Sequence, residues 1–340
     1  MNYNFLKRGI KEMDLKELFT KNTIALDLSL VSKYRSSLMG IATIGIILCH
    51  ATPNGVNLPP LLKSVFGIGQ LGVDVFFFLS GLGLFYSLSK PHNNVWEWYR
   101  KRFLRIIVPY LIIYAPALLL ICLEEERSWW YYFYNLSTVS FWFNDGGCWF
   151  IAILVPLYLV APLWKVLLDR LQYSVLLTVL ICAILFSIGF VMMPYLSDYL
   201  NQCLFFFIGM WLGKKIMGGG IILNIKQLLQ CCILFSILLA LYKLHPVFPL
   251  FWVIFFPILY LTCLLLDLIK SKRVNTVLSS IGSISLESYL YNVTLIVWIN
   301  SFNLIPINLY RYRYVFIVFI GIGLSYIVHR ISSWVLNVIN

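Results

Sequence analysis

The sequence comprises 340 residues, of which 61% are apolar, 17% aromatic and only 12% charged, and its mean hydropathy is +0.85. A soluble domain carries about a quarter charged residues, and a chain of this length cannot enclose so large an apolar excess. The composition therefore excludes a single water-soluble globule, together with disordered, collagen-like and coiled-coil proteins. The eight cysteines lack the paired spacing of a disulfide or zinc framework, so we expect no metal site.

Ten stretches are apolar and long enough to predict membrane-spanning helices, because a span needs about 20 mostly apolar residues. In chain order they cover residues 36–53, 65–88, 103–123, 148–168, 173–193, 199–216, 228–243, 247–268, 281–300 and 313–336. Turn-forming or charged segments separate them, and neither an internal repeat nor a separate soluble domain is found. We predict an all-α polytopic membrane protein in which residues 36–340 form one embedded domain of about ten helices.

Residues 1–35 mix lysine with acidic residues and lack the apolar core and cleavage site of a signal peptide. The apolar positions Leu6, Ile10, Met13 and Leu18 are typical of an amphipathic segment that lies on the cytoplasmic face of the membrane. A plain cytoplasmic tail is an equal alternative.

The net charge of +12, from 26 basic and 14 acidic side chains, raises nucleic-acid binding as a candidate function. Counting loops alternately from a cytoplasmic N-terminus, however, places 21 of the 26 cations on the cytoplasmic side. The five on the other side are Lys63, Arg127, Lys243, Arg311 and Arg313. This distribution follows the positive-inside rule. It predicts cytoplasmic N- and C-termini and explains the charge without a nucleic-acid partner.

Two ionisable residues in the first two predicted spans are candidates for catalysis. His50 ends the first span near the exterior, and Asp74 lies about nine residues, or roughly 13 Å, below that surface. A histidine beside a carboxylate that orients it is the arrangement of a general base in acyl transfer. The alternatives are an interfacial histidine that faces water and an aspartate bonded to backbone at a glycine-rich helix crossing.

Further polar residues mark candidate ligand contacts. Arg102 and Arg105, spaced i and i+3, project from one helical face and suit a phosphate-bearing cytosolic ligand, although a basic flank that binds lipid headgroups explains them too. The segment SISLESYLYN makes the ninth predicted span polar enough to face a protein interior. Trp149 opens the fourth span, where an aromatic-belt role is the alternative. The residues expected to line the site are Arg35, Ser80, Trp149, Ser285, Glu287, Tyr289 and Asn292.

The ordered motifs of the chain resemble those of the bacterial acyltransferase-3 family, integral-membrane enzymes that O-acylate glycans. The resemblance rests on the block from Arg35 to His50 and on the segments GVDVFFFLSGLGLFYS, RKRFLRIIVPY, CWFIAILVPLYLVAPLW and SISLESYLYN, and it extends from residue 35 to about residue 300. Each motif alone is weakly specific, whereas their order is fairly specific.

The resemblance implies transfer of an acyl group from cytosolic acyl-CoA, usually acetyl-CoA, to a hydroxyl of an extracytoplasmic glycan or glycolipid at the bacterial cytoplasmic membrane. By the same resemblance, His50 is the essential histidine, and Arg102 and Arg105 are the acyl-CoA-side arginines. Two departures matter. Many members carry a basic residue where this chain has Met39, leaving Arg35 as the nearest substitute, and many carry a histidine where it has Asn292.

Two other function classes stay open at this stage. A glycan or lipid transporter would also combine about ten spans with buried polar residues, but would usually show inverted repeats, which we do not find. A non-catalytic membrane partner is compatible with the two departures. The aromatic-rich segment at residues 128–147 is a candidate for stacking on sugar rings or for an interfacial belt.

Overall fold

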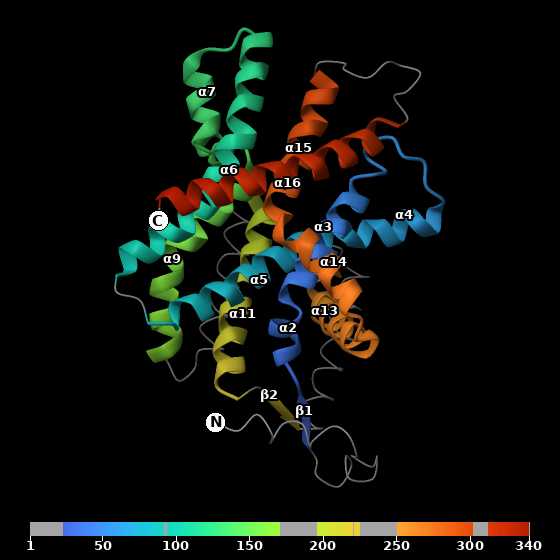
Figure 1. The fold of residues 1–340 in the computed structure, drawn as a ribbon, viewed down its shortest axis with the longest axis vertical. Coiled ribbons are helices and arrows are strands. Elements are labelled where there is room, and N and C mark those ends of the chain that lie inside the picture. The colour runs from blue at the N-terminus through green and yellow to red at the C-terminus, as the bar shows by residue number, and fades with distance from the viewer. Residues whose placement is uncertain are drawn as a thin grey trace. The chain divides into compact units, whose positions relative to one another are not determined.

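The computed structural model describes residues 23–91, 94–170, 196–219, 221–224, 250–301 and 312–339. Most of these residues are helical, as predicted (Figure 1). The chain divides into two compact units, one formed by Met1–Lys33 with Lys215–Ile269 and the other by Tyr34–Lys214 with Lys270–Asn340. The larger unit holds every described residue that was predicted to belong to the site.

The smaller unit contains two strands and two helices among its described residues. They are β1 (Thr23–Leu26), α2 (Ser29–Lys33), β2 (Ile221–Asn224) and α13 (Leu250–Ile269). The strands pair antiparallel, and this small sheet is an addition to the predicted helical architecture.

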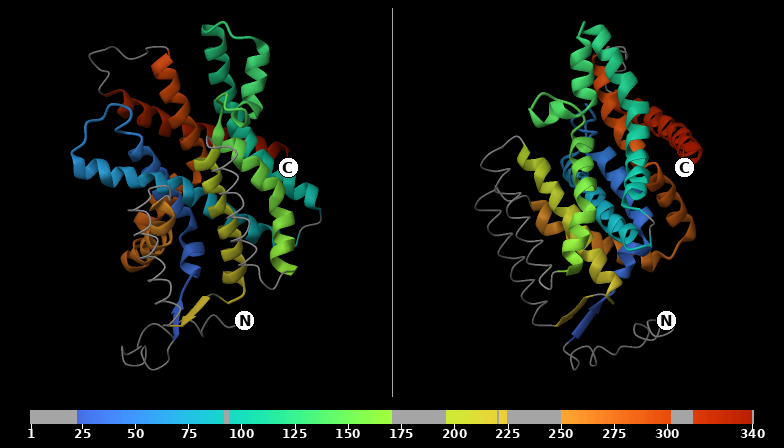
Figure 2. Two further views of the ribbon diagram at one scale, coloured as in Figure 1. Left: turned by 180° about the vertical axis from the view of Figure 1, so that it is seen from behind. Right: turned by 90° about the vertical axis from the view of Figure 1, so that its left-hand side faces the viewer.

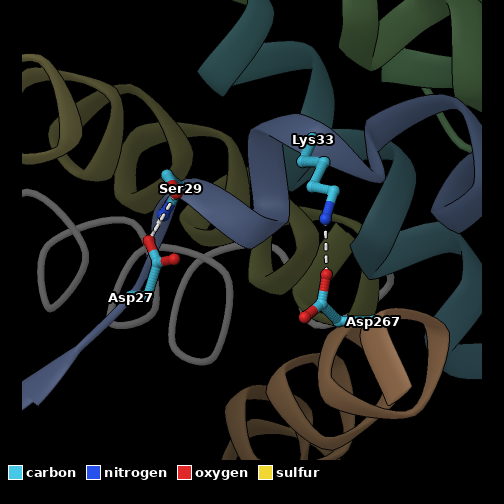
Figure 3. A network of polar contacts seen from close by, with 4 residues as sticks. All are labelled: Asp27, Ser29, Lys33 and Asp267. Atoms are coloured by element: carbon cyan, nitrogen blue, oxygen red, sulfur yellow. Dashed lines mark hydrogen bonds and ion pairs between the residues drawn. The ribbon is translucent and has the colours of Figure 1, made fainter. Parts of the chain in front are cut away.

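Polar contacts fix α2 inside this unit, as Figure 3 shows. Asp27 accepts hydrogen bonds from the backbone N–H of Ser29, at 3.0 Å, and from the Ser29 hydroxyl, which begins the helix. Lys33 at the other end of α2 forms an ion pair with Asp267 of α13, with 2.5 Å between Nζ and Oδ1. The lysine side chain is more than half exposed, so the pair contributes little stability and serves to orient α2.

The larger unit is built from helices throughout its described part. They are α3 (Arg35–Cys49), α4 (Pro60–Gly67), the 3-10 turn η1 (Ile68–Gln70), α5 (Leu71–Leu88), α6 (Val95–Glu124), α7 (Trp129–Leu136), α8 (Val139–Trp142), α9 (Trp149–Arg170), α11 (Ser197–Met217, in this unit as far as Lys214), α14 (Lys272–Ser283), α15 (Ser285–Ser301) and α16 (Arg313–Ile339).

Four stretches of the described chain are long and apolar enough to cross a membrane: Pro60–Leu88, Val95–Glu124, Trp149–Arg170 and Arg313–Val338. Arg35–Cys49 and Ile254–Ile269 are shorter apolar helices. The predicted spans at 173–193 and 228–243 lie outside the described residues, as does the proposed amphipathic segment before residue 23. A helical membrane protein is thus supported, while the number of ten spans and the orientation of the termini stay predictions.

The ninth predicted span, 281–300, corresponds to two helices instead of one. Residues 272–283 form α14, the helix ends with Ile284 as its C-cap, and α15 begins at Ser285. Gly40 of α3 and Gly282 of α14 bring these helices into backbone contact, because a Cβ at either position would lie 2.0 Å from a carbonyl oxygen of the other helix. Small residues at a crossing allow such an approach. The sequence pattern missed α14 because that helix is only weakly apolar.

Helix α5 is enclosed on all sides by the described part of the larger unit. Its side chains Phe77, Phe78, Leu79 and Leu82 are completely buried. It crosses α11 at the glycine pair Gly81 and Gly209, and it contacts α3 at Gly72. A helix that is apolar on all sides can be buried on all sides, and α3, α9 and α11 accordingly pack around α5.

The second half of α6 and the short helix α7 form an antiparallel hairpin, which can be followed in both views of Figure 2. Tyr110 of α6 donates to the carbonyl of Leu136 at 2.9 Å, and Tyr132 of α7 donates to the carbonyl of Ala115 at 3.4 Å. The aromatic side chains of Trp129, Trp130 and Phe133 remain mostly exposed. They form an exposed aromatic face, and the extracytoplasmic position of this segment stays a prediction.

Candidate functional site

Three arginines gather where α3, α5 and α6 meet. Arg35 of α3 donates from Nε to the carbonyl of Leu79 at 3.2 Å, and Arg102 of α6 donates from Nη2 to the hydroxyl of Ser87 at 2.5 Å. Arg35, Arg102 and Arg105 lie within electrostatic range of one another. We call these three residues the arginine cluster. The structure thus brings Arg35 close to Arg102 and Arg105. Arg35 is the nearest basic residue to Met39, the position at which many members of the family carry a basic side chain.

The surroundings of the arginine cluster favour an anionic ligand. Trp98 shares the Ser87 hydroxyl with Arg102, donating to it at 2.8 Å, and Ser80 hydrogen-bonds to Tyr158, which lies within electrostatic range of all three arginines. Among the described residues, the ion pairs involve other side chains, so no described carboxylate neutralises the cluster. Guanidinium groups gathered with no described counter-ion have the donor chemistry that suits an oxyanion such as phosphate.

His50 lies at the opposite end of α3 from Arg35. The two residues are 15 positions apart, which corresponds to about 22 Å along a helix. His50 caps the C-terminus of α3, and its carbonyl accepts a hydrogen bond from the Asn54 amide at 2.7 Å. One helix therefore connects the arginine cluster to the candidate base.

The predicted pairing of His50 with Asp74 is not formed as a hydrogen bond through Nδ1. The Nδ1 atom of His50 is buried and has no hydrogen-bond partner among the described residues. Asp74 is buried in the first turn of α5, with 7% of its surface exposed. The role of Asp74 as an orienting carboxylate therefore stays a prediction.

Trp149 and Tyr289, two predicted site residues on different helices, do meet. Trp149 at the start of α9 hydrogen-bonds to Tyr289 of α15, with 6.2 Å between the ring centroids. The ring centroid of Phe150 lies 4.7 Å from that of Tyr289, and the ring centroid of Tyr199 of α11 lies 4.9 Å from that of Trp149. Tyr199 and Phe150 are members of this aromatic group that the sequence pattern did not single out, since aromatic residues are abundant throughout the chain.

The polar residues of α15 divide between two partners on α16. Glu287 is buried and pairs with His329 at 3.0 Å between Oε1 and Nδ1, while Asn292 donates to the hydroxyl of Tyr314 at 3.2 Å. Ser285, the first residue of α15, is also buried. Glu287 thus binds His329, which the sequence analysis missed. His329 could have been identified from the sequence, because it is an ionisable residue inside the last predicted span.

The site holds no candidate metal centre in the described part of the chain, where no three His, Cys, Asp or Glu side chains converge. The residues suited to a negatively charged co-substrate are the three arginines. Fold and site together define a helical membrane protein with a cationic cluster at one end of a helix and a histidine at the other.

The chain matches a family model described as an acyltransferase domain over residues 38–330. It therefore belongs to the acyltransferase-3 family and is a membrane acyltransferase, which confirms the resemblance of its motifs. No curated protein and no solved structure shows significant similarity to it. The matched range includes His50, Arg102 and Arg105 but begins after Arg35, so the assignment of Arg35 to the arginine cluster rests on the structure.

Proposed function

We propose that this acyltransferase moves an acyl group, most simply acetyl, from cytosolic acyl-CoA to a hydroxyl of an extracytoplasmic glycan or glycolipid in the bacterial cytoplasmic membrane. The observation that carries the proposal is the arginine cluster without a described counter-ion, held at one end of α3 while His50 stands at the other. A carrier with phosphates at one end and a thioester at the other fits this separation.

The donor would bind with its phosphates at Arg35, Arg102 and Arg105. Guanidinium groups present paired N–H donors that match phosphate oxygens, and they stay charged at any relevant pH. The hydrogen bond from Arg35 to the Leu79 carbonyl supports this placement, because it holds the side chain within electrostatic range of the other two arginines. The pantetheine arm would then run along α3 toward His50.

His50 would act as the general base. As the acceptor hydroxyl oxygen attacks the thioester carbonyl carbon, His50 takes the hydroxyl proton. The carbon–sulfur bond then breaks, an ester forms on the acceptor, and the departing thiolate recovers the proton from His50 as free CoA. A covalent acyl-histidine is the alternative route. Rapid-quench trapping of an acylated enzyme without acceptor would favour it over direct attack.

The proposal is tested in membranes that carry the wild type, His50→Ala or the control His92→Gln, supplied with radiolabelled acetyl-CoA; His92 lies between the second and third predicted spans. We expect His50→Ala to reduce glycan acetylation by at least about 100-fold, the contribution of a general base, and His92→Gln to retain it. Unchanged acetylation in His50→Ala membranes would refute the proposed function. Mass spectrometry of surface glycans from cells with and without the protein would identify the acceptor.

A further inference from the structure

We infer that Arg313 and Tyr314, in the first turn of α16, position His50 for proton transfer, acting through Asn54 and the last turn of α3. This inference rests on the proposed function. We call Asn54, Arg313 and Tyr314 the His50 clamp. None of the three emerges from sequence motifs, and Arg313 and Tyr314 lie more than 250 residues from the segment they hold.

Tyr314 completes the C-terminus of α3. The last carbonyls of a helix have no partner within it and must be satisfied from elsewhere. In a continuing helix Ala51 N–H would bond to Ile47, but it donates to the carbonyl of Leu48 at 3.1 Å. The Ile47 carbonyl instead accepts the hydroxyl of Tyr314 at 2.5 Å. The tyrosine thus fixes the backbone one turn before His50.

Arg313 fixes the backbone that follows His50. It donates from Nε to the carbonyl of Asn54 at 3.2 Å, and the Asn54 amide donates to the carbonyl of His50 at 2.7 Å. Both Arg313 and Asn54 are more than nine-tenths buried. The turn closes at Gly55, whose φ of +91° is readily adopted only by glycine. His50 is therefore held from both sides by consecutive residues of one helix.

Packing makes these contacts rigid. The ring of Tyr314 belongs to a buried cluster with Ala51, Leu295 and Ile317, so it touches α15, α16 and the turn after His50. Its hydroxyl accepts from the Asn292 amide at 3.2 Å while it donates to Ile47. A hydroxyl with both roles filled has one orientation.

This arrangement supplies what a catalytic histidine otherwise obtains from a carboxylate. A hydrogen bond to the second ring nitrogen usually orients such a ring. Here Nδ1 of His50 makes no hydrogen bond to a described carboxylate, so the backbone that the clamp holds on either side contributes to where the ring points. A misplacement of about 1 Å costs catalysis on the order of 100-fold. The geometry points to the His50 clamp as the positioning device.

The test uses purified full-length Tyr314→Phe and Arg313→Gln, with Tyr326→Phe as the matched control because this exposed tyrosine of α16 contacts Arg330 instead. We expect both clamp variants to lower kcat about 10- to 100-fold while the acyl-CoA KM changes less than about twofold, since the arginine cluster is untouched. Arg313→Lys should restore part of the lost kcat. The control should match the wild type.

Amide hydrogen exchange gives a readout that is independent of turnover. We expect faster exchange at residues 50–56 in both clamp variants and no change there in Tyr326→Phe. An unchanged kcat, or a lowered kcat with unchanged exchange at 50–56, would overturn the inference. Failure of the proposed function would be seen separately, as a wild-type protein without acyl transfer.

Discussion

Two glycines of α5, two residues apart, allow the donor site to be tested apart from the fold. A Cβ at Gly83 would lie 2.4 Å from Nη2 of Arg35, whereas a Cβ at Gly81 would lie 2.0 Å from the backbone carbonyl oxygen of Phe206 in α11. The first obstacle is the end of a flexible side chain and the second is a helix backbone. The same substitution by alanine should therefore have different consequences at the two positions.

Gly83→Ala should displace Arg35 and preserve the fold. Ordinary contact begins near 3.5 Å, so the guanidinium must move by about 1 Å, which breaks its bond to Leu79. The loss of one charge-assisted contact to a phosphate costs about 1.5–3 kcal/mol, or roughly 10- to 150-fold in acyl-CoA affinity. Alanine is favoured over glycine inside a helix by about 1 kcal/mol, which offsets the local adjustment.

Gly81→Ala should destabilise the protein without a specific effect on the donor. The Phe206 carbonyl can make room only if α5 and α11 separate, and overpacking of this kind costs about 1–3 kcal/mol. We expect a lower Tm and a smaller folded yield, with the acyl-CoA affinity of the folded fraction close to that of the wild type.

The assay compares acyl-CoA binding and Tm for both variants in detergent. An acyl-CoA affinity of Gly83→Ala equal to that of the wild type would refute the placement of Arg35 in the donor site. An equal loss of Tm and of affinity in both variants would show that the spacing of the helices around α5, and not the position of Arg35, governs donor binding.

Two further predictions concern the charged groups. Acyl-CoA should raise the thermal stability of the wild-type protein in membranes, and Arg102→Ala or Arg105→Ala should abolish this protection. The control Lys101→Ala should keep it, because the exposed Lys101 ammonium pairs with Glu97 of its own helix. Retained protection in the arginine variants would indicate that these arginines contact lipid instead. His329→Phe should leave the buried carboxylate of Glu287 without its partner and lower the stability by about 1–3 kcal/mol, measured as thermal unfolding; a Tm equal to that of the wild type would contradict the importance of this pair.

The sequence by itself determined the class of the protein. An apolar excess that no globule of this size can bury requires lipid, whatever the packing of the helices. The order of short motifs was sufficient to identify the family, and it named His50, Arg102 and Arg105 because the two arginines are close in sequence and the histidine ends an apolar stretch. These properties are local, so a linear pattern can carry them.

Only the tertiary structure decided which residues stand together. It joined Arg35 to the arginine cluster, paired Glu287 with His329 and brought Arg313 and Tyr314 to the backbone around His50. The hydropathy of a span is the same whichever of its faces meets a neighbouring helix, and contacts across more than 250 residues depend on that choice. The sequence predicts Arg313 to be one of five exterior cations, and in the structure it is buried and donates to the carbonyl of Asn54, in the turn that follows His50.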